Sequence, residues 1–372
     1  MSSSFGTNIK VQIFGQSHSE MLGVVIDGLP VGYEIDMEYI QAFLDRRRGG
    51  KNAWSTARAE ADTARVVSGL LNGVTCGAPL CALFENADVR SEDYDELKDV
   101  PRPSHADFYA REKYRGWQDT RGGGHFSGRM TLPLCFAGAV CKQILEEWDI
   151  YLGAHIEQLY TELDEPYDPV SVSREDLLYG TGFPVNDSAI AERMQALMCE
   201  AAESGDSLGG TIECAVIGMN MGDGAPIFDG IANRLSAAIF AVPAVRGIEF
   251  GAGFEAAGMR GSEHNDAFFV LDEDGGDQDR ALSLYDWVGH RSNNAGGIVG
   301  GLATGMPIIF RAVIKPTPSI ALEQDSVNLR TKEEVKLSIE GRHDACIVPR
   351  AVPCIEAAAA IALMDVCMSV DS

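Results

Sequence analysis

Two segments of this chain are apolar on nearly every side, and such segments are stable only inside a protein. Residues 131–147 have helical composition, and the first turns carry apolar side chains all round. Residues 353–368 form an alanine-rich run of strong helix formers. Both segments therefore predict buried helices, and the remaining elements must be arranged to cover them.

Short strand patterns are mixed with helical ones along the rest of the chain. The pattern predicts strands at 8–14, 22–26, 210–218 and 306–314, and helices at 36–46, with Asp36 as N-cap, at 188–203 and at 229–241. Residues 159–186 are acidic and interrupted by proline, which predicts an excursion on the surface. Because strands and helices do not alternate regularly, we expect an α+β or layered β-α-β fold rather than a doubly wound parallel sheet.

The charge balance excludes several kinds of partner. The chain has 372 residues, 45% of them hydrophobic, and a formal net charge of −25. A chain this acidic is not expected to bind nucleic acid or an anionic membrane, because both attract a basic surface. No apolar stretch approaches the ~20 residues of a membrane span, and the first residues lack the basic-then-apolar order of a signal peptide.

The nine cysteines indicate a reducing compartment. Their number is odd, no two are spaced C-x-x-C, and most have apolar neighbours. This usage predicts buried thiols in a cytoplasmic protein without a structural metal site.

Positive charge is concentrated in a few glycine-rich loops of this acidic chain. These loops are 46–51, 102–107, 121–129, 315–319 and 341–344, and the glycine-rich loop 293–301, which has no charged residue, is considered with them. Arginine recognises phosphates and carboxylates with paired N–H groups, and glycine lets backbone N–H groups approach them. Four of the seven histidines (His18, His105, His125 and His343) lie in or beside such segments. Together these features favour an enzyme pocket for anionic ligands.

Each loop also has a simpler explanation when taken alone. Three arginines near a helix end usually form a solvated face. Lys315–Ser319 alone indicates a turn, and single histidines such as His155, His264 and His290 are usually structural. The G-x-G-x-x-G and P-loop patterns do not occur, so a Rossmann dinucleotide site is unsupported.

The order of the motifs points to one family. The segments that carry the likeness are 14–19, 25–30, 99–107, 121–131, 205–210, 243–247, 260–266, 293–301, 315–319, 341–346 and 350–353. From about residue 8 to residue 368 the sequence resembles chorismate synthase. The resemblance implies a β-α-β sandwich, with two antiparallel sheets and helices between and around them, formed by a single domain (1–372) and assembled as a homotetramer. Segments 131–147 and 353–368 are then candidates for the middle layer.

The resemblance also implies a reaction. Chorismate synthases are lyases of the shikimate pathway, which supplies the aromatic amino acids. They remove phosphate and a C6 hydrogen from 5-enolpyruvylshikimate 3-phosphate by anti-1,4-elimination. The family uses reduced FMN without net redox change, through transient electron donation by the flavin and removal of the hydrogen at its N5. A phosphate and two carboxylates on the substrate, with a phosphate on FMN, suit the cationic loops.

Site residues follow from the resemblance by position. His18 corresponds to the acid that protonates the leaving phosphate, His105 to the histidine beside the reduced flavin, and Asp344 to the carboxylate that assists proton removal at flavin N5. Ser17 and Ser127 correspond to hydroxyls of the same network. Arg47, Arg48, Arg129 and Arg350 are the predicted substrate ligands. The predicted FMN contacts are His125, Phe126, Ser127, Pro243, Ala244, Gly300, Lys315, Pro316, Thr317, Pro318, Ser319 and Arg342.

The sequence departs from the family pattern near these positions. Gln16 and Ser19 replace Glu and Gly, Ser104 replaces Gly, Ala53 stands where many members have Arg, and His125, Phe126 and Met130 replace Arg, Ser and Glu. These changes predict an altered affinity for flavin. Because His18, His105, Asp344, Ser127 and Arg129 are retained, we still expect an active enzyme.

Two other functions remain open at this point. One is a flavin oxidoreductase with net hydride transfer from a nicotinamide (NADP), which the missing dinucleotide motif disfavours. The other is a non-catalytic paralogue that binds a phosphorylated ligand, suggested by the altered 125–130 segment. The lack of a nicotinamide motif favours an external flavin reductase over self-reduction with NADPH.

Overall fold

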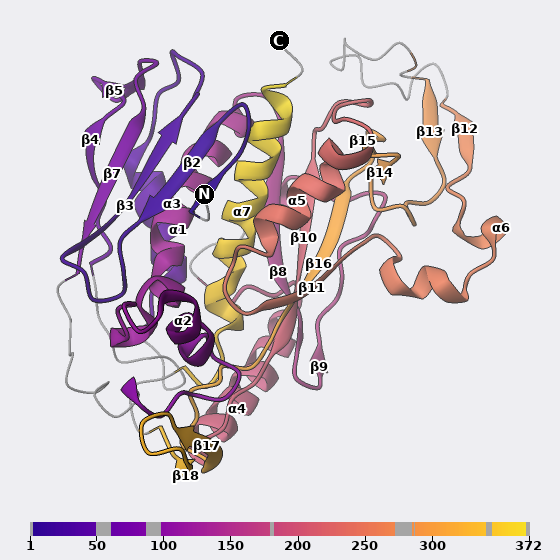
Figure 1. The fold of residues 1–372 in the computed structure, drawn as a ribbon. Helices are drawn as coiled ribbons and strands as arrows, with labels where there is room; N and C mark the ends of the chain where they lie inside the picture. The colour runs from indigo at the N-terminus through magenta and orange to yellow at the C-terminus, as the bar shows by residue number, and fades with distance from the viewer. Residues whose placement is uncertain are drawn as a thin grey trace.

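The computed structural model describes residues 3–49, 61–86, 98–178, 182–271, 285, 287–339 and 344–369. A layer of helices lies between two five-stranded antiparallel sheets (Figure 1). This arrangement confirms the predicted α+β fold and its β-α-β sandwich.

The first sheet comes from the N-terminal part of the chain. Its strands, in spatial order, are β1 (Ser4–Phe5), β2 (Lys10–Phe14), β3 (Met21–Asp27), β7 (Leu80–Glu85) and β4 (Arg65–Ser68). The predicted strands at 8–14 and 22–26 are β2 and β3, which pair from Lys10 opposite Asp27 to Phe14 opposite Gly23. A small hairpin of β5 (Leu70–Leu71) and β6 (Val74–Thr75) lies beside this sheet.

The second sheet comes from the middle of the chain. Its spatial order is β11 (Val245–Phe250), β16 (Ile308–Ile314), β10 (Gly210–Ile217), β8 (Tyr151–Leu159) and β9 (Glu162–Leu163). The predicted strands at 210–218 and 306–314 are its neighbours β10 and β16. Smaller hairpins are β12 (Phe268–Val270) with β13 (Val288–His290), β14 (Ile298–Val299) with β15 (Leu302–Ala303), and β17 (Gln324–Asn328) with β18 (Glu333–Leu337).

The two apolar segments form the middle layer. Helix α3 (Thr131–Glu146) packs on β2, β3 and β7 of the first sheet, and α7 (Val348–Cys367) packs on β8, β10 and β16 of the second. The two helices meet so closely that a Cβ on Gly138 would overlap the backbone of Ala357. Every residue of α7 from 351 to 366 is buried. The prediction of buried core helices is confirmed, although α7 begins five residues earlier than expected.

Further helices surround this layer. They are α1 (Met37–Arg47), α2 (Asp107–Tyr114), α4 (Ser188–Ser204), α5 (Ile231–Ile239) and α6 (Gly261–His264), with 3-10 turns η3 (Arg121–Phe126), η4 (Gly128–Met130), η5 (Glu175–Leu177), η6 (Ile227–Asp229) and η7 (Gly253–Gly258). The carboxylate of Asp36 accepts from the backbone N–H groups of Glu38 (2.7 Å) and Tyr39 (3.2 Å), which confirms the predicted N-cap.

The acidic stretch 159–186 is more than a surface excursion. Tyr167, Val172 and Leu177 are buried against Ala215 and Ile309, so the stretch covers part of the outer face of the second sheet. The prediction was incomplete because widely spaced apolar side chains are hidden by the acidic composition around them.

His155 of β8 anchors this stretch and is structural, as expected. Its Nδ1 lies 2.9 Å from Asp164 and its Nε2 lies 2.9 Å from Glu213, and all three side chains are buried. Burial lowers the pKa of His155, but the hydrogen bonds and charges of the two carboxylates outweigh burial and raise it above 6.5.

The predicted burial of the cysteines holds for five of the nine. All nine cysteines are free thiols, and Cys135, Cys141, Cys214, Cys346 and Cys354 are buried. Within the part of the chain that the structure describes, no helix is long and apolar enough to cross a membrane, and no three His, Cys, Asp or Glu side chains are grouped to hold a metal ion.

Candidate active site

A turn of three glycines between α2 and α3 brings two predicted catalytic residues together. Gly122, Gly123 and Gly124 have φ values of +58°, +84° and +57°, which favour glycine. A Cβ on Gly122 would lie 2.5 Å from the ring of His18, and one on Gly123 would lie 3.3 Å from the ring of His105. Both imidazoles therefore lie close to this turn, which has no room for side chains at Gly122.

The N-terminal loop is held against the same turn. The backbone N–H of Ser17 donates to the carbonyl of Gly124 at 3.0 Å, and the side chains of Ser17 and His18 are buried. Ser19 closes the loop, because its hydroxyl lies 2.9 Å from the backbone nitrogen of Gln16 and 2.7 Å from the carbonyl of Met21. The departure at Ser19 thus stabilises the loop that carries His18.

His105 belongs to a hydrogen-bonded cluster at the start of α2. Its Nδ1 lies 2.7 Å from Asp107 Oδ1, and Arg102 donates to both oxygens of Asp107 at 2.7 and 2.9 Å. Burial raises the pKa of Asp107, but hydrogen bonds from Arg102 and His105 outweigh it and hold the pKa well below its usual range. Arg102 Nη2 also lies 3.1 Å from His105 Nδ1, so Asp107 and Arg102 together fix the orientation of the imidazole.

The loop after β16 reaches this cluster. Arg102 Nη1 donates to the hydroxyl of Ser319 at 3.1 Å, and Lys315 Nζ donates to the carbonyl (2.6 Å) and hydroxyl (3.0 Å) of Ser104. Ser104 has φ +59°, so the residue that replaces a family glycine adopts the left-handed backbone that glycine favours. Burial, together with the charge of Arg246, lowers the pKa of Lys315.

Several predicted FMN contacts adjoin Lys315. The backbone N–H of Lys315 donates to the carbonyl of Ala244 at 3.0 Å, and Ser207 donates to the carbonyl of Thr317 at 2.8 Å. Pro243, Pro316 and Pro318 are covalent neighbours of these residues. The structure therefore groups Ala244, Lys315 and Ser319 with His105.

The three consecutive arginines at the end of α1 have different partners. Arg46 binds the buried Glu356 of α7 at 2.5 Å and is structural. Arg47 binds Asp62, which also binds Arg129 of η4. Arg48 pairs with Asp45 at 2.9 Å on a half-exposed part of the helix. Of these three, Arg47 joins the other predicted substrate ligands.

Asp62 is shared by two buried arginines. Its Oδ2 accepts from Arg47 and its Oδ1 from Arg129, and all three side chains are at most 6% exposed. Burial raises the pKa of Asp62, but the charges of Arg47 and Arg129 outweigh burial and lower it. Arg129 also donates from Nε to Asn86 at 3.0 Å, and Asn86 donates to the carbonyl of Ser19 at 2.7 Å.

Asp344 and Arg350 complete the group. The guanidinium of Arg350 binds the Asp344 carboxylate through Nη1, and its Nε donates to the backbone carbonyl of Arg47 at 2.9 Å. A continuous set of contacts thus runs from Asp344 through Arg350 and Arg47 to Asp62. In this part of the site, predicted catalytic and substrate-binding residues are brought together.

Other predicted residues lie apart or have other partners. His125 lies between the carbonyl of Gly15 (2.8 Å) and the hydroxyl of Ser3 (3.0 Å), and Phe126 packs on Tyr114. The Ser127 hydroxyl accepts from the backbone N–H of Arg129 at 3.2 Å.

Two predicted FMN contacts, Gly300 and Arg342, are not among the residues grouped with Lys315 and His105. Gly300 lies in the turn of the β14–β15 hairpin, and the next residue, Gly301, accepts from the backbone N–H of Ile231 at the start of α5 (Figure 1). Arg342 and His343 fall outside the described residues, as does Ala53.

Three residues of the site were not singled out from the sequence. Arg102 and Asp107 flank His105, and the spacing Arg-x-x-His-x-Asp is a signal for a positioned histidine. Asp62 has no local signal, because its partners are 15 and 67 residues away in the chain.

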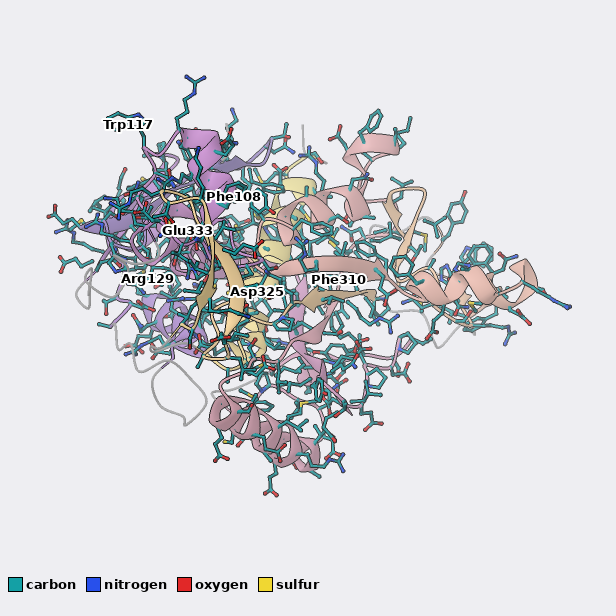
Figure 2. The ribbon with its side chains drawn as sticks, turned by 60° about the horizontal axis from the view of Figure 1, so that its bottom comes forward. Phe108, Trp117, Arg129, Phe310, Asp325 and Glu333 are labelled. Carbon is teal, nitrogen blue, oxygen red and sulfur yellow. The ribbon has the colours of Figure 1, made fainter. Side chains whose placement is uncertain are left out.

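The charges of this site suit anionic ligands. Five cations (Arg47, Arg102, Arg129, Lys315 and Arg350) are grouped with three carboxylates (Asp62, Asp107 and Asp344), which leaves a formal charge of +2. The Nε of Arg47 is buried and has no hydrogen-bond partner among the described residues. Figure 2 shows Arg129 on the left among the N-terminal elements, with the buried Phe310 of the second sheet nearer the middle of the view.

Two histidines beside one glycine turn and the clustered arginines of this β-α-β sandwich indicate an enzyme that acts on anionic substrates. The family model for chorismate synthase matches residues 9–368. The chorismate synthase of Lancefieldella parvula is 42% identical over 98% of this chain and 96% of its own, and that of Thermococcus gammatolerans is 41% identical over 97% and 96%. A crystal structure of chorismate synthase matches with a TM-score of 0.72 and 26% identity, over 98% of this chain and 93% of that one.

The chain belongs to the chorismate synthase family. The members of this family are lyases that form chorismate in the last step of the shikimate pathway.

Proposed function

We propose that this protein converts 5-enolpyruvylshikimate 3-phosphate to chorismate and phosphate by anti-1,4-elimination, with reduced FMN as cofactor. The observation that carries the proposal is the glycine turn 122–124, because the rings of His18 and His105 both lie close to it. Family membership supports the reaction, and the arrangement of these two histidines supports its chemistry.

The arginine cluster suits the charges of the substrate. A phosphate and two carboxylates require several cationic donors, and Arg47, Arg129 and Arg350 belong to one connected group. Arginine binds such groups through paired N–H donors, and the buried Nε of Arg47 is available for a ligand oxygen. Arg48 stays a predicted ligand, since its partner in the structure is Asp45.

His18 is positioned to donate a proton to the leaving phosphate. It is buried, and its ring lies so close to Gly122 that a Cβ on this glycine would meet it at 2.5 Å. Protonation of the departing oxygen lowers the charge that develops on phosphate as the C–O bond breaks. Ser17 and Ser127 are proposed as hydroxyls of the same proton network.

The residues around Lys315 suit reduced FMN. Lys315, Thr317 and Ser319 supply an amine and hydroxyls, and Lys315 and Ser319 contact the loop that carries His105 through Ser104 and Arg102. Pro243, Ala244, Pro316 and Pro318 lie next to them in these loops. When bound, reduced FMN supplies electron density to the substrate and takes up the hydrogen lost from C6. His105, held by Asp107 and Arg102, would contact the reduced cofactor, and Asp344, held by Arg350, would assist removal of the proton from it.

His125, Phe126, Gly300 and Arg342 stay predicted FMN contacts. His125 is engaged by Ser3 and Gly15, so we propose that it orders the N-terminal loop as well. Because His125 stands where the family has arginine, we expect this protein to bind flavin more weakly.

Anaerobic turnover tests the proposal. Purified protein is mixed with photoreduced FMN and 5-enolpyruvylshikimate 3-phosphate, and chorismate and phosphate are measured. Equal amounts of the two products are expected, without consumption of NADPH. NADPH consumption matched to product would favour a flavin oxidoreductase, and ligand binding without any product would favour a non-catalytic paralogue.

The assembly and supply of cofactor also stay proposals. We expect one domain spanning 1–372, a cytoplasmic homotetramer, and reduced flavin delivered by an external reductase. Light scattering tests the tetramer. The reductase is tested by comparing turnover with NADPH alone and with NADPH plus a flavin reductase.

A further inference from the structure

Asp62 joins three parts of the chain that are distant in sequence. Arg47 ends α1, Asp62 precedes β4, and Arg129 lies in η4 directly before α3. Each oxygen of the Asp62 carboxylate accepts from a different arginine. The position of one guanidinium relative to the other is therefore set by the width of a single carboxylate.

We propose that Asp62 is a positioning residue of the reaction, which fixes the spacing of Arg47 and Arg129 so that both can receive an anionic group of the substrate. This inference rests on the proposed function. Asp62 itself does not touch the reacting atoms in this account, because both of its oxygens are engaged by arginines.

The electrostatics explain why a carboxylate is needed here. Two buried guanidinium groups repel each other, and a buried charge is costly unless it is paired. Asp62 neutralises one of the two positive charges and leaves a net positive pair. The pair can still attract an anion, whereas two unpaired arginines would turn toward solvent or toward other carboxylates.

The backbone at Asp62 supports a dedicated role. Its φ is +51°, a left-handed conformation that most residues with a side chain avoid. Aspartate and asparagine are the residues, apart from glycine, that adopt it most readily. Such backbone conformations persist where the surrounding structure holds them, and they are concentrated at functional sites.

Both arginines are also fixed from a second side. Arg129 Nε donates to Asn86 at 3.0 Å, and the Arg47 carbonyl accepts from Arg350 at 2.9 Å. The buried Nε of Arg47 has no hydrogen-bond partner within the described ranges, and a buried N–H donor of this kind calls for a ligand oxygen. Asp62 thus holds Arg47 with this donor still available.

The matched variant is Asp62→Asn. Asparagine has the same shape and tolerates the same backbone, but it can accept from only one arginine and carries no charge. We expect the KM for 5-enolpyruvylshikimate 3-phosphate to rise about tenfold or more, with a smaller change in kcat. Inhibition by inorganic phosphate should be unchanged or stronger, because the site gains one positive charge. Asp62→Glu restores the negative charge and should bring the KM part of the way back to the wild-type value.

Asp325→Asn is the control. Asp325 lies on the β17–β18 hairpin (Figure 2), is 90% exposed and pairs with Lys336, so its loss of charge should leave KM unchanged. A KM in Asp62→Asn within about twofold of wild type would overturn the proposal, and a lower KM would show that Asp62 competes with the substrate instead. If both Asp62 variants bound the substrate and inorganic phosphate more weakly, and by the same factor, Asp62 would have a structural role only.

Calorimetric titration of the substrate without flavin separates this inference from the proposed function. Suppose that Asp62→Asn binds the substrate more weakly than wild type, while neither protein forms chorismate in the separate assay with reduced FMN. This result would support the positioning role of Asp62 and reject the proposed activity. Chorismate formation by wild type, with unchanged substrate binding in Asp62→Asn, would reject Asp62 alone. Wild-type protein that does not bind the substrate would reject both.

Discussion

Arg350 binds the carboxylate of Asp344, so a residue assigned to the substrate also orients one assigned to catalysis. The same guanidinium reaches the backbone of Arg47 at 2.9 Å, which links Asp344 to the rest of the arginine cluster. Binding of the substrate and placement of the carboxylate are therefore expected to depend on each other.

Arg350→Ala tests this link. The variant should raise KM and also lower kcat about 100-fold, because Asp344 loses its orienting partner. Steady-state kinetics with reduced FMN measure both constants. Arg330→Ala is the control, since Arg330 is exposed and pairs only loosely with Asp99 at 3.6 Å. A rise in KM with an unchanged kcat would show that Arg350 serves the substrate alone.

Gly122→Ala should nearly abolish turnover. The new Cβ would meet the ring of His18 at 2.5 Å and would stand on a left-handed backbone, so His18 must move, and a shift of about 1 Å costs roughly 100-fold in rate. Gly116→Ala is the matched control, because Gly116 has φ +80° but no neighbour within 4 Å of its Cβ. Similar activity in the two variants would contradict the contact between the turn and His18.

Asp107→Asn should lower kcat roughly 10- to 100-fold, because a partner that orients a functional histidine contributes about this much.

The effect of Asp107→Asn on stability depends on pH. The folded pKa of Asp107 lies below the unfolded value, so its stabilisation is full above about pH 4 and is lost as pH falls through the folded pKa. Urea unfolding from pH 7 down to pH 3 should show the wild type and the variant converging. A constant difference in the free energy of unfolding would contradict the assignment.

His155 gives the opposite dependence on pH. Its folded pKa is raised, so the stabilisation by Asp164 and Glu213 is full below about pH 6.5 and is lost as pH rises through the folded pKa. Thermal unfolding of wild type should show this loss, and His155→Gln should lack it. His264→Gln, on the short helix α6, serves as the control. An unchanged pH profile in His155→Gln would reject the assignment.

The sequence predicted the layers of this fold better than the contacts of the site. Segments 131–147 and 353–368 are apolar on nearly every side, so their burial between other elements followed directly. The stretch 159–186 was harder, because Tyr167 and Leu177 are single apolar residues in acidic surroundings.

Side-chain partners could not be read in the same way. Ordered motifs indicated His18, His105 and Asp344, but Asp62 becomes visible only when α1, β4 and η4 are packed together. Likewise, the three adjacent arginines have unrelated partners. Residues 46, 47 and 48 lie at the end of a helix, where successive side chains point in different directions. Local spacing does not specify contacts between elements that are far apart in the chain.

Ser104→Gly tests a departure from the family. Glycine removes the left-handed strain at φ +59°, worth about 1 kcal/mol, but also removes the hydroxyl that accepts from Lys315. We expect a stability close to wild type and a changed affinity for oxidised FMN, measured by flavin fluorescence. An unchanged flavin affinity would show that the Ser104 hydroxyl does not influence the cofactor site.

The most direct test of the account compares wild type with His18→Ala under anaerobic conditions. With photoreduced FMN and 5-enolpyruvylshikimate 3-phosphate, wild type should release phosphate and chorismate in equal amounts. His18→Ala should bind the substrate, keep its fold, and lose about 100-fold or more of this rate. Wild type that releases no phosphate, or His18→Ala that turns over at a near-wild-type rate, would contradict the account.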